Sequence, residues 1–118
     1  MMLRSIAVVA LAAALAVGVA GTAAARSSSA RAATVMVRAK DFSFVLSTKV
    51  VAHGRVTFVI VNGGKTSHDF AIAGHRSKVI SPGKTTRLVL TLARGRYPYR
   101  CTVDSHAKLG MKGVLRVT

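Results

Sequence analysis

From Thr34 onward, apolar side chains recur in runs with a period of two residues, which is the pattern of β-strands with one buried face. Turn-forming residues interrupt these runs at nearly regular intervals, for example at Ser81-Pro82-Gly83. No stretch of this region has the period of an amphipathic helix. The pattern predicts strands near residues 34–40, 42–47, 55–62, 68–73, 86–92, 97–101 and 113–118, and a short edge strand over 48–52. Such spacing is typical of an antiparallel sandwich or barrel, and we expect an all-β, antiparallel Greek-key β-sandwich of about seven to eight strands.

Residues 1–25 have the features of an export signal peptide. Arg4 precedes an almost uninterrupted apolar stretch over residues 5–21, and the three alanines at 23–25 fit the small-residue cleavage pattern. A retained membrane anchor is the alternative, because the apolar stretch reaches the lower end of the roughly 17 to 25 residues needed to span a bilayer. In both cases we expect an exported protein that is periplasmic, held in the cell envelope or secreted.

The rest of the chain is long enough for one small domain. Residues 26–33 carry no periodicity and are expected to form a flexible leader, which places the folded domain at 34–118. Exported domains of this size often depend on disulfides, but the single cysteine, Cys101, excludes an internal one. A lone exported cysteine is explained by an inert buried thiol, an intermolecular disulfide or metal binding.

Metal binding is favoured by the residues that follow this cysteine. Cys101, His106 and Met111 form a Cys-x4-His-x4-Met run, and a further histidine, His68, stands at the start of the predicted strand 68–73. Two imidazoles, one thiolate and a weak axial thioether are the ligands of copper sites that transfer electrons. Because a sandwich gathers loops at each of its ends, we expect the upstream histidine to meet the other three side chains there.

The same residues resemble the motifs of the cupredoxins, the small blue copper proteins, and in particular their plastocyanin-like and sulfocyanin-like members. The resemblance covers residues 34–118 and rests on Asn62-Gly63, His68-Asp69-Phe70 and Tyr97-x-Tyr99-x-Cys101-x4-His106-x4-Met111-Lys112-Gly113. It implies that one copper ion is bound by His68 and His106 through ring nitrogens, by Cys101 as a thiolate and by Met111 at a longer axial distance. It also implies that Asp69 ties the two ligand loops together by a hydrogen bond beside the metal.

The predicted function is electron transfer by copper that alternates between Cu(I) and Cu(II), without enzyme activity. We expect Ala107, Leu109 and the exposed edge of His106 to form an apolar docking patch, bordered by Lys108 and Lys112. The alternative is copper handling, as delivery, buffering or resistance, because the ligand identities do not exclude it.

An enzyme with a catalytic copper would need further histidines, and only His53 and His75 remain. Both lie beside glycines and are expected to be surface residues in turns. Met36 and the four phenylalanines are expected in the sandwich core: Phe42, Phe44, Phe58 and Phe70. Tyr97, Tyr99 and Cys101 should share one face of their strand. Gly110 and Gly113 should permit the turn around Met111.

The net charge of the chain limits the classes of partner that it is expected to bind. The chain has 18 lysines and arginines against three acidic residues, for a formal net charge of +15. Such a field speeds encounters with acidic redox proteins or holds a protein near an anionic membrane or envelope surface, although a generic solvated basic surface explains the same composition. The basic residues are scattered and lack aromatic stacking partners, which argues against nucleic acid. Nothing in the pattern requires an oligomer, and we expect a monomer.

Overall fold

The computed structural model describes residues 32–118. The expected signal at 1–25 and most of the expected leader at 26–33 lie outside the described residues. The first strand, β1 (Ala32–Lys40), begins two residues before the predicted start. No helix in the described part of the chain is long and apolar enough to cross a membrane.

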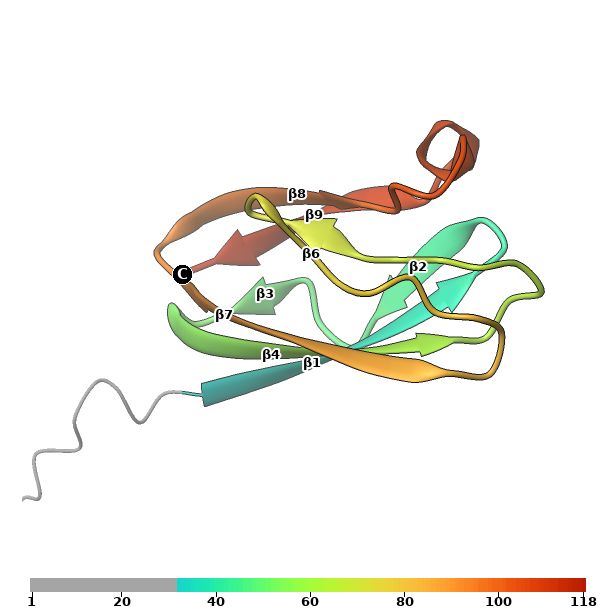
Figure 1. The fold of residues 1–118 in the computed structure, drawn as a ribbon. Coiled ribbons are helices and arrows are strands. Elements are labelled where there is room, and N and C mark those ends of the chain that lie inside the picture. The colour runs from blue at the N-terminus through green and yellow to red at the C-terminus, as the bar shows by residue number, and fades with distance from the viewer. Residues whose placement is uncertain (1–31) are drawn as a thin grey trace, which may run out of the picture.

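Two β-sheets pack face to face (Figure 1). One sheet has the order β2-β1-β4-β7. Besides β1 it contains β2 (Ser43–Leu46), β4 (Gly54–Asn62) and β7 (Thr85–Leu92). The other sheet has the order β3-β9-β8-β5-β6. Its strands are β3 (Val50–Val51), β5 (Ala71–Ile72), β6 (His75–Arg76), β8 (Gly95–Arg100) and β9 (Lys112–Val117). A short 3-10 helix, η2 (His106–Leu109), separates β8 from β9.

The all-β sandwich is confirmed, but its strand pairing is mixed rather than purely antiparallel. Within residues 32–118, β1 runs parallel to β4 and β3 runs parallel to β9, whereas the other pairs are antiparallel. Parallel neighbours need a crossover of about a dozen residues or more, and residues 41–53 provide it between β1 and β4 by way of β2 and β3. Hydrophobic alternation reports which side chains are buried and carries no information on strand direction.

The predicted strand over 68–73 is shorter than expected. Only Ala71–Ile72 forms a regular strand, and His68 is held by an isolated antiparallel bridge to Ile80. A two-residue strand, His75–Arg76, follows and was not predicted. Because the strand Ala71–Ile72 is so short, His68 lies in a loop. The bridge to Ile80 fixes the backbone of His68.

The main core lies between the two sheets. Phe58 and Phe70 are fully buried, and the ring centroid of Phe70 lies 5.2 Å from that of Phe58 and 5.4 Å from that of Tyr99. Phe44 is partly buried and packs against the same cluster. The expectation for Met36 is wrong, because this side chain is 45% exposed. In β1 the odd-numbered residues face the core, so Met36 faces solvent.

A second, smaller apolar cluster occupies one end of the sandwich. It contains Ala39, Cys101 and Met111, with Phe42 and other partly buried residues packed against it. Figure 1 shows the red coil of η2 at this end and the C-terminus at the opposite end. The elements that carry the predicted ligands therefore converge on one end of the molecule.

Candidate metal centre

The loop that carries His68 is held in place by a buried asparagine. Asn62, the last residue of β4, donates from Nδ2 to the carbonyl oxygens of Thr66 and Ile80, at 2.8 Å each. Its Oδ1 accepts from the N–H of Gly64 at 2.9 Å. Backbone hydrogen bonds of 3.1 and 2.8 Å then join His68 to Ile80. One side chain thus organises the turn, and the rigid strands position the histidine.

The other three predicted ligands come from the segment between β8 and β9. Cys101 follows β8 directly, and its N–H donates to the carbonyl of Met111 at 3.0 Å. The N–H of Met111 in turn donates to the carbonyl of His106 at 3.2 Å. Gly110 ends η2 with φ of 120°, a conformation that favours glycine. The segment therefore closes on itself, and its two ends are anchored by the strands.

Gly113 has a different role from the one expected. Its φ is not positive, and a Cβ atom at this position would collide with the Tyr99 ring and hydroxyl. The two residues are cross-strand partners in β8 and β9. Gly113 thus leaves room for a buried tyrosine rather than forming the turn.

His68, Cys101 and His106 come together as a buried cluster. Cys101 Sγ lies 3.9 Å from Nδ1 of His68 and 3.7 Å from Nδ1 of His106. The three donor atoms lie within 4.8 Å of one another. Exposure is 0% for His68, 1% for Cys101 and 7% for His106. Two imidazole nitrogens and one sulfur therefore face a common point that is closed to bulk water except beside His106.

These distances fit a trigonal metal site. Metal–nitrogen bonds of about 2.0 Å and a metal–sulfur bond of about 2.3 Å, separated by roughly 120°, place nitrogen and sulfur about 3.7 Å apart. Met111 is fully buried in the same cluster as Cys101, which puts a thioether beside the triangle. The donor set of two imidazoles, one thiol and one thioether suits copper. The structure therefore brings together all four predicted ligands.

Asp69 makes the link between ligand loops that was expected of it. This fully buried carboxylate follows His68 in the chain, and its Oδ1 accepts from the N–H of Thr102 at 2.6 Å. Its Oδ2 accepts from the Thr102 hydroxyl. Because Thr102 follows Cys101, this pair of hydrogen bonds ties the residues next to two predicted ligands to each other. The effect of the link on a bound metal stays a prediction.

Asp41 is a residue of the site that the sequence analysis missed. Its Oδ1 lies 2.7 Å from Nε2 of His68. Its Oδ2 accepts from the N–H of Lys65 at 2.8 Å, and Oδ1 accepts from the Thr66 hydroxyl at 2.9 Å. The hydrogen bond from Lys65, with those from His68 and Thr66, lowers the pKa of Asp41 to about 2 against the opposing effect of desolvation. An ionised carboxylate only accepts hydrogen bonds, so Nε2 of His68 carries its proton and Nδ1 is free to bind a metal.

Phe42 was expected in the sandwich core and instead covers the predicted ligands. Its ring centroid lies 4.8 Å from that of His106 and 6.3 Å from that of His68. Its carbonyl oxygen lies 3.3 Å from where a Cβ atom on Gly110 would stand. Apolar alternation cannot separate the middle of a sandwich from its end, which explains the error. The aromatic ring contributes to excluding water from both imidazoles.

Burial also determines the state of the thiol. Desolvation raises the pKa of Cys101, so the metal-free protein keeps this sulfur protonated at neutral pH. A metal that coordinates the sulfur removes that proton. Metal binding is therefore expected to release a proton from Cys101.

The two remaining histidines do not join the cluster, as expected. Nδ1 of His53 lies 3.0 Å from the carbonyl oxygen of Thr118, and His75 is exposed on β6.

Around His106 the expected apolar patch is present as exposed surface, since Leu109 is 61% exposed and Ala107 is partly exposed. Lys108 and Lys112 beside it are exposed as well.

Comparison with known proteins identifies the fold. A family model described as a cupredoxin-like domain matches residues 8–117. Auracyanin B is 22% identical with a TM-score of 0.65, over 73% of this chain and 88% of that one. Auracyanin A of Chloroflexus aurantiacus, a blue copper protein, is 20% identical with a TM-score of 0.63, over 75% of this chain and 100% of that one. A blue copper oxidase from Nitrosomonas europaea is 18% identical with a TM-score of 0.59, over 74% of this chain but 39% of the oxidase. No curated protein sequence matches the chain significantly.

Proposed function

Because the chain belongs to the cupredoxin-like domain family, we propose that it is a small exported blue copper protein that carries electrons through one mononuclear copper site. The observation that carries this proposal is the buried triangle of His68 Nδ1, Cys101 Sγ and His106 Nδ1, with Met111 packed beside it. Auracyanin A, a blue copper protein, has the same fold, which supports the choice of metal.

Each side chain has a distinct role in this proposal. Nδ1 of His68, Nδ1 of His106 and the Cys101 thiolate would hold the ion, and Met111 would be a further, weaker ligand. The bound copper would supply one-electron chemistry between Cu(I) and Cu(II). Asp41 and Asp69 hold the ligand loops, while Phe42 helps to exclude water. A scaffold that is rigid before metal binding limits the rearrangement that accompanies each change of charge.

Electrons would enter and leave through the edge of His106. This is the most exposed member of the triangle, at 7%. Ala107 and Leu109 surround it with apolar surface, and Lys108 and Lys112 add positive charge at its border. We propose that the partner is an acidic redox protein. The apolar patch would allow water to be excluded from the interface, so that the partner approaches His106 closely. The carrier itself would act as a monomer.

Electron transfer is favoured over copper handling by the burial of the donor atoms. A protein that delivers copper must release it readily, whereas three enclosed donors held by strands favour retention. Within residues 32–118, His68, Cys101 and His106 form a single cluster of metal-binding side chains. We therefore propose a carrier rather than an oxidase, although one similar fold belongs to a blue copper oxidase.

The test is to load the purified protein with one equivalent of Cu(II) and record its visible absorption and electron paramagnetic resonance spectra. We expect an intense thiolate-to-copper band with narrow hyperfine splitting. The Cys101→Ser variant is the control and should lose the band. A pale, ordinary Cu(II) spectrum or the absence of stoichiometric binding would reject the blue copper site.

A further inference from the structure

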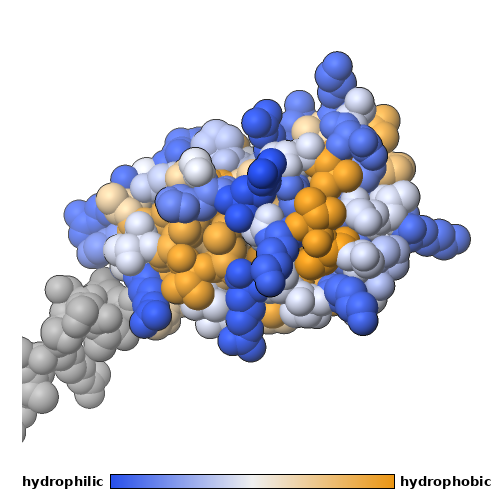
Figure 2. Space-filling model, viewed as in Figure 1, coloured by the Kyte–Doolittle hydropathy of each residue, from blue (hydrophilic) through white to orange (hydrophobic). Residues whose placement is uncertain are grey.

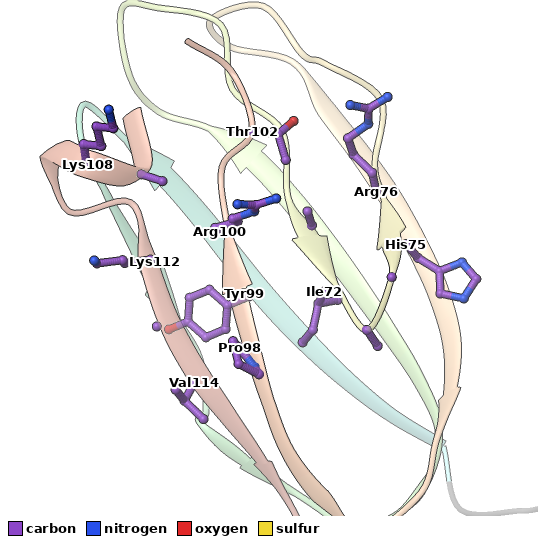
Figure 3. Close-up of a pocket in the computed structure, with 15 residues that line it drawn as sticks. Ile72, His75, Arg76, Pro98, Tyr99, Arg100, Thr102, Lys108, Lys112 and Val114 are labelled. Atoms are coloured by element: carbon purple, nitrogen blue, oxygen red, sulfur yellow. The ribbon is translucent and has the colours of Figure 1, made fainter. Parts of the chain in front are cut away.

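A groove with basic walls crosses the outer face of the five-stranded sheet, next to the metal centre (Figure 3). It is lined by residues of β5, β6, β8 and β9 and of η2, and its volume is about 1090 Å³. Four exposed cationic side chains line it: Arg76, Arg100, Lys108 and Lys112. Figure 3 shows Arg100 between Arg76 and Lys112, while the ring of His75 points away.

Three of these cations occupy one row across four strands. Ala71 of β5 pairs with both Arg76 of β6 and Arg100 of β8, and Arg100 pairs with Lys112 of β9. Neighbouring strands lie about 4.8 Å apart, so the row spans about 14 Å. Two like charges directly opposite each other in an antiparallel pair are destabilising. Arg100 and Lys112 therefore form an arrangement that an anionic ligand would relieve.

Within residues 32–118, no carboxylate is paired with the cations of this row. The lining residues include no acid. Among residues 32–118, no lysine or arginine lies within 4.0 Å of an aspartate side chain, and the contact of that kind that does occur joins His68 to Asp41. Asp69 lies behind Thr102 in the groove wall, but it is fully buried and both of its oxygens already accept hydrogen bonds from Thr102. The groove consequently keeps an uncompensated positive field.

The chain carries 18 lysines and arginines, so positive charge alone does not distinguish the groove from other surfaces. The visible face in Figure 2 shows hydrophilic side chains distributed over the molecule, with apolar areas between them. Arg96 and Arg116 form the same kind of like-charged pair nearer the other end of β8 and β9, but neither lines the groove. The distinguishing feature is therefore the combination of a row of cations with a hollow beside the metal centre.

We propose that this groove binds a carboxylate-rich, extended segment of a partner protein. A row of about 14 Å matches roughly four residues of extended chain at about 3.3 Å each. The two guanidinium groups are suited to bidentate carboxylate contacts. Val114, 39% exposed, and Pro98 supply an apolar floor for the backbone of such a segment. Cations arranged in a line inside a hollow fit a strand of carboxylates better than a single small anion or a flat bilayer.

The position of the groove links this binding to the metal centre. Arg100 immediately precedes Cys101, and Lys112 immediately follows Met111. Lys108 lies on η2 beside the apolar patch around His106. A partner held in the groove would reach that patch with a neighbouring part of its surface. This consequence for electron transfer rests on the proposed function, whereas binding of the segment does not.

The chain offers a matched pair of variants to test the proposal. Arg100→Glu and Arg96→Glu make the same charge change four residues apart on the same strand, and only the first alters the groove. Binding of fluorescein-labelled hexaglutamate is measured by fluorescence anisotropy at low ionic strength, using metal-free and copper-loaded protein. We expect Arg100→Glu to weaken binding at least tenfold and Arg96→Glu less than threefold. Arg100→Gln removes the charge without reversing it and should weaken peptide binding to an intermediate extent. This variant keeps the test valid if Arg100→Glu does not fold.

Equal losses in both variants would overturn the proposal, because they would indicate attraction by the overall charge alone. So would the absence of peptide binding combined with Arg100-dependent binding to phosphatidylserine vesicles, which would make the groove a membrane contact. Peptide binding that depends on Arg100 in a protein without a blue copper spectrum would support the groove while rejecting the proposed function. Failure of the groove proposal and failure of the proposed function are thus distinguishable.

Discussion

Nε2 of His68 lies 2.7 Å from Oδ1 of Asp41, a residue 27 positions earlier in the chain. This contact joins the end of β1 to the loop after β4. It orients the imidazole so that the opposite nitrogen, Nδ1, faces Cys101 Sγ at 3.9 Å. The metal-free protein is thereby prepared for metal binding by a carboxylate that does not itself belong to the donor triangle.

Replacing this carboxylate should impair the site through His68. We expect Asp41→Ala to lower copper affinity by about 10- to 100-fold, the usual effect of losing a residue that orients a metal-bound histidine. In the metal-free variant, nitrogen NMR of the imidazole should show that the proton is no longer confined to Nε2. Asp41→Asn keeps a hydrogen-bond acceptor and should retain more of the affinity. An unchanged affinity and tautomer in Asp41→Ala would refute the orienting role.

Gly64 should be indispensable because the Asp41–His68 pair lies against it. A Cβ atom at this position would stand 2.9 Å from Nε2 of His68 and would collide with the Asp41 carboxylate. We expect Gly64→Ala to lower the free energy of unfolding by about 1 to 3 kcal/mol, as overpacking does, and to reduce copper affinity. Thermal and denaturant unfolding measure the first effect.

Gly63→Ala is the matched control for this prediction. The three atoms nearest to its Cβ atom would all belong to the Arg38 side chain, the first at 3.0 Å, and that flexible side chain can move away. A loss of stability in the control as large as in Gly64→Ala would show that the loop resists any added side chain, and the specific explanation would fail.

Asp69→Ala should loosen the two ligand loops from each other. The variant leaves the N–H and the hydroxyl of Thr102 without their acceptor, which costs about 1 to 3 kcal/mol where these groups stay buried. We also expect the absorption band and the reduction potential of the copper-loaded protein to shift. Asp104→Ala, which removes an exposed acid, serves as the comparison. An unchanged spectrum and potential in Asp69→Ala would leave Asp69 with a purely structural role.

Leu109→Asp should slow electron transfer without altering the copper site. The side chain is 61% exposed, so stability should change by no more than about 0.5 kcal/mol. A charge in the centre of the docking patch should reduce the electron self-exchange rate, measured by NMR line broadening, at least tenfold. Val89→Asp introduces the same charge on β7 of the other sheet, where the native side chain is 46% exposed. Equal rates in the two variants would contradict the patch.

The four predicted ligands could be identified from the sequence because three of them are soft donors at fixed spacing. His68 was the natural fourth member once loops were expected to gather at one end. Asp41 was not identifiable, since an acid at the end of a strand is common and only the tertiary structure brings it to His68. The prediction for Phe42 was wrong for the same reason, because the neighbours of this side chain depend on the conformation of the turn between β1 and β2.

The fold shows a similar division between local and long-range information. The alternation of apolar and polar residues predicted the strand positions well. It could not reveal that β1 pairs in parallel with β4. Three consecutive apolar residues at 35–37 satisfy both phases of a two-residue period, so the pattern did not show that Met36 faces solvent. Both features follow from which strands become neighbours, and that depends on contacts between distant segments.

The most direct test of electron carriage is whether copper stays bound while its charge changes. The copper-loaded protein is reduced and reoxidised through repeated cycles in the presence of a competing Cu(I) chelator, and the thiolate-to-copper absorption band is measured after each cycle. A carrier with buried donors should regain nearly all of the band every time. Progressive transfer of copper to the chelator on reduction would contradict electron carriage and identify the protein as a copper-handling one.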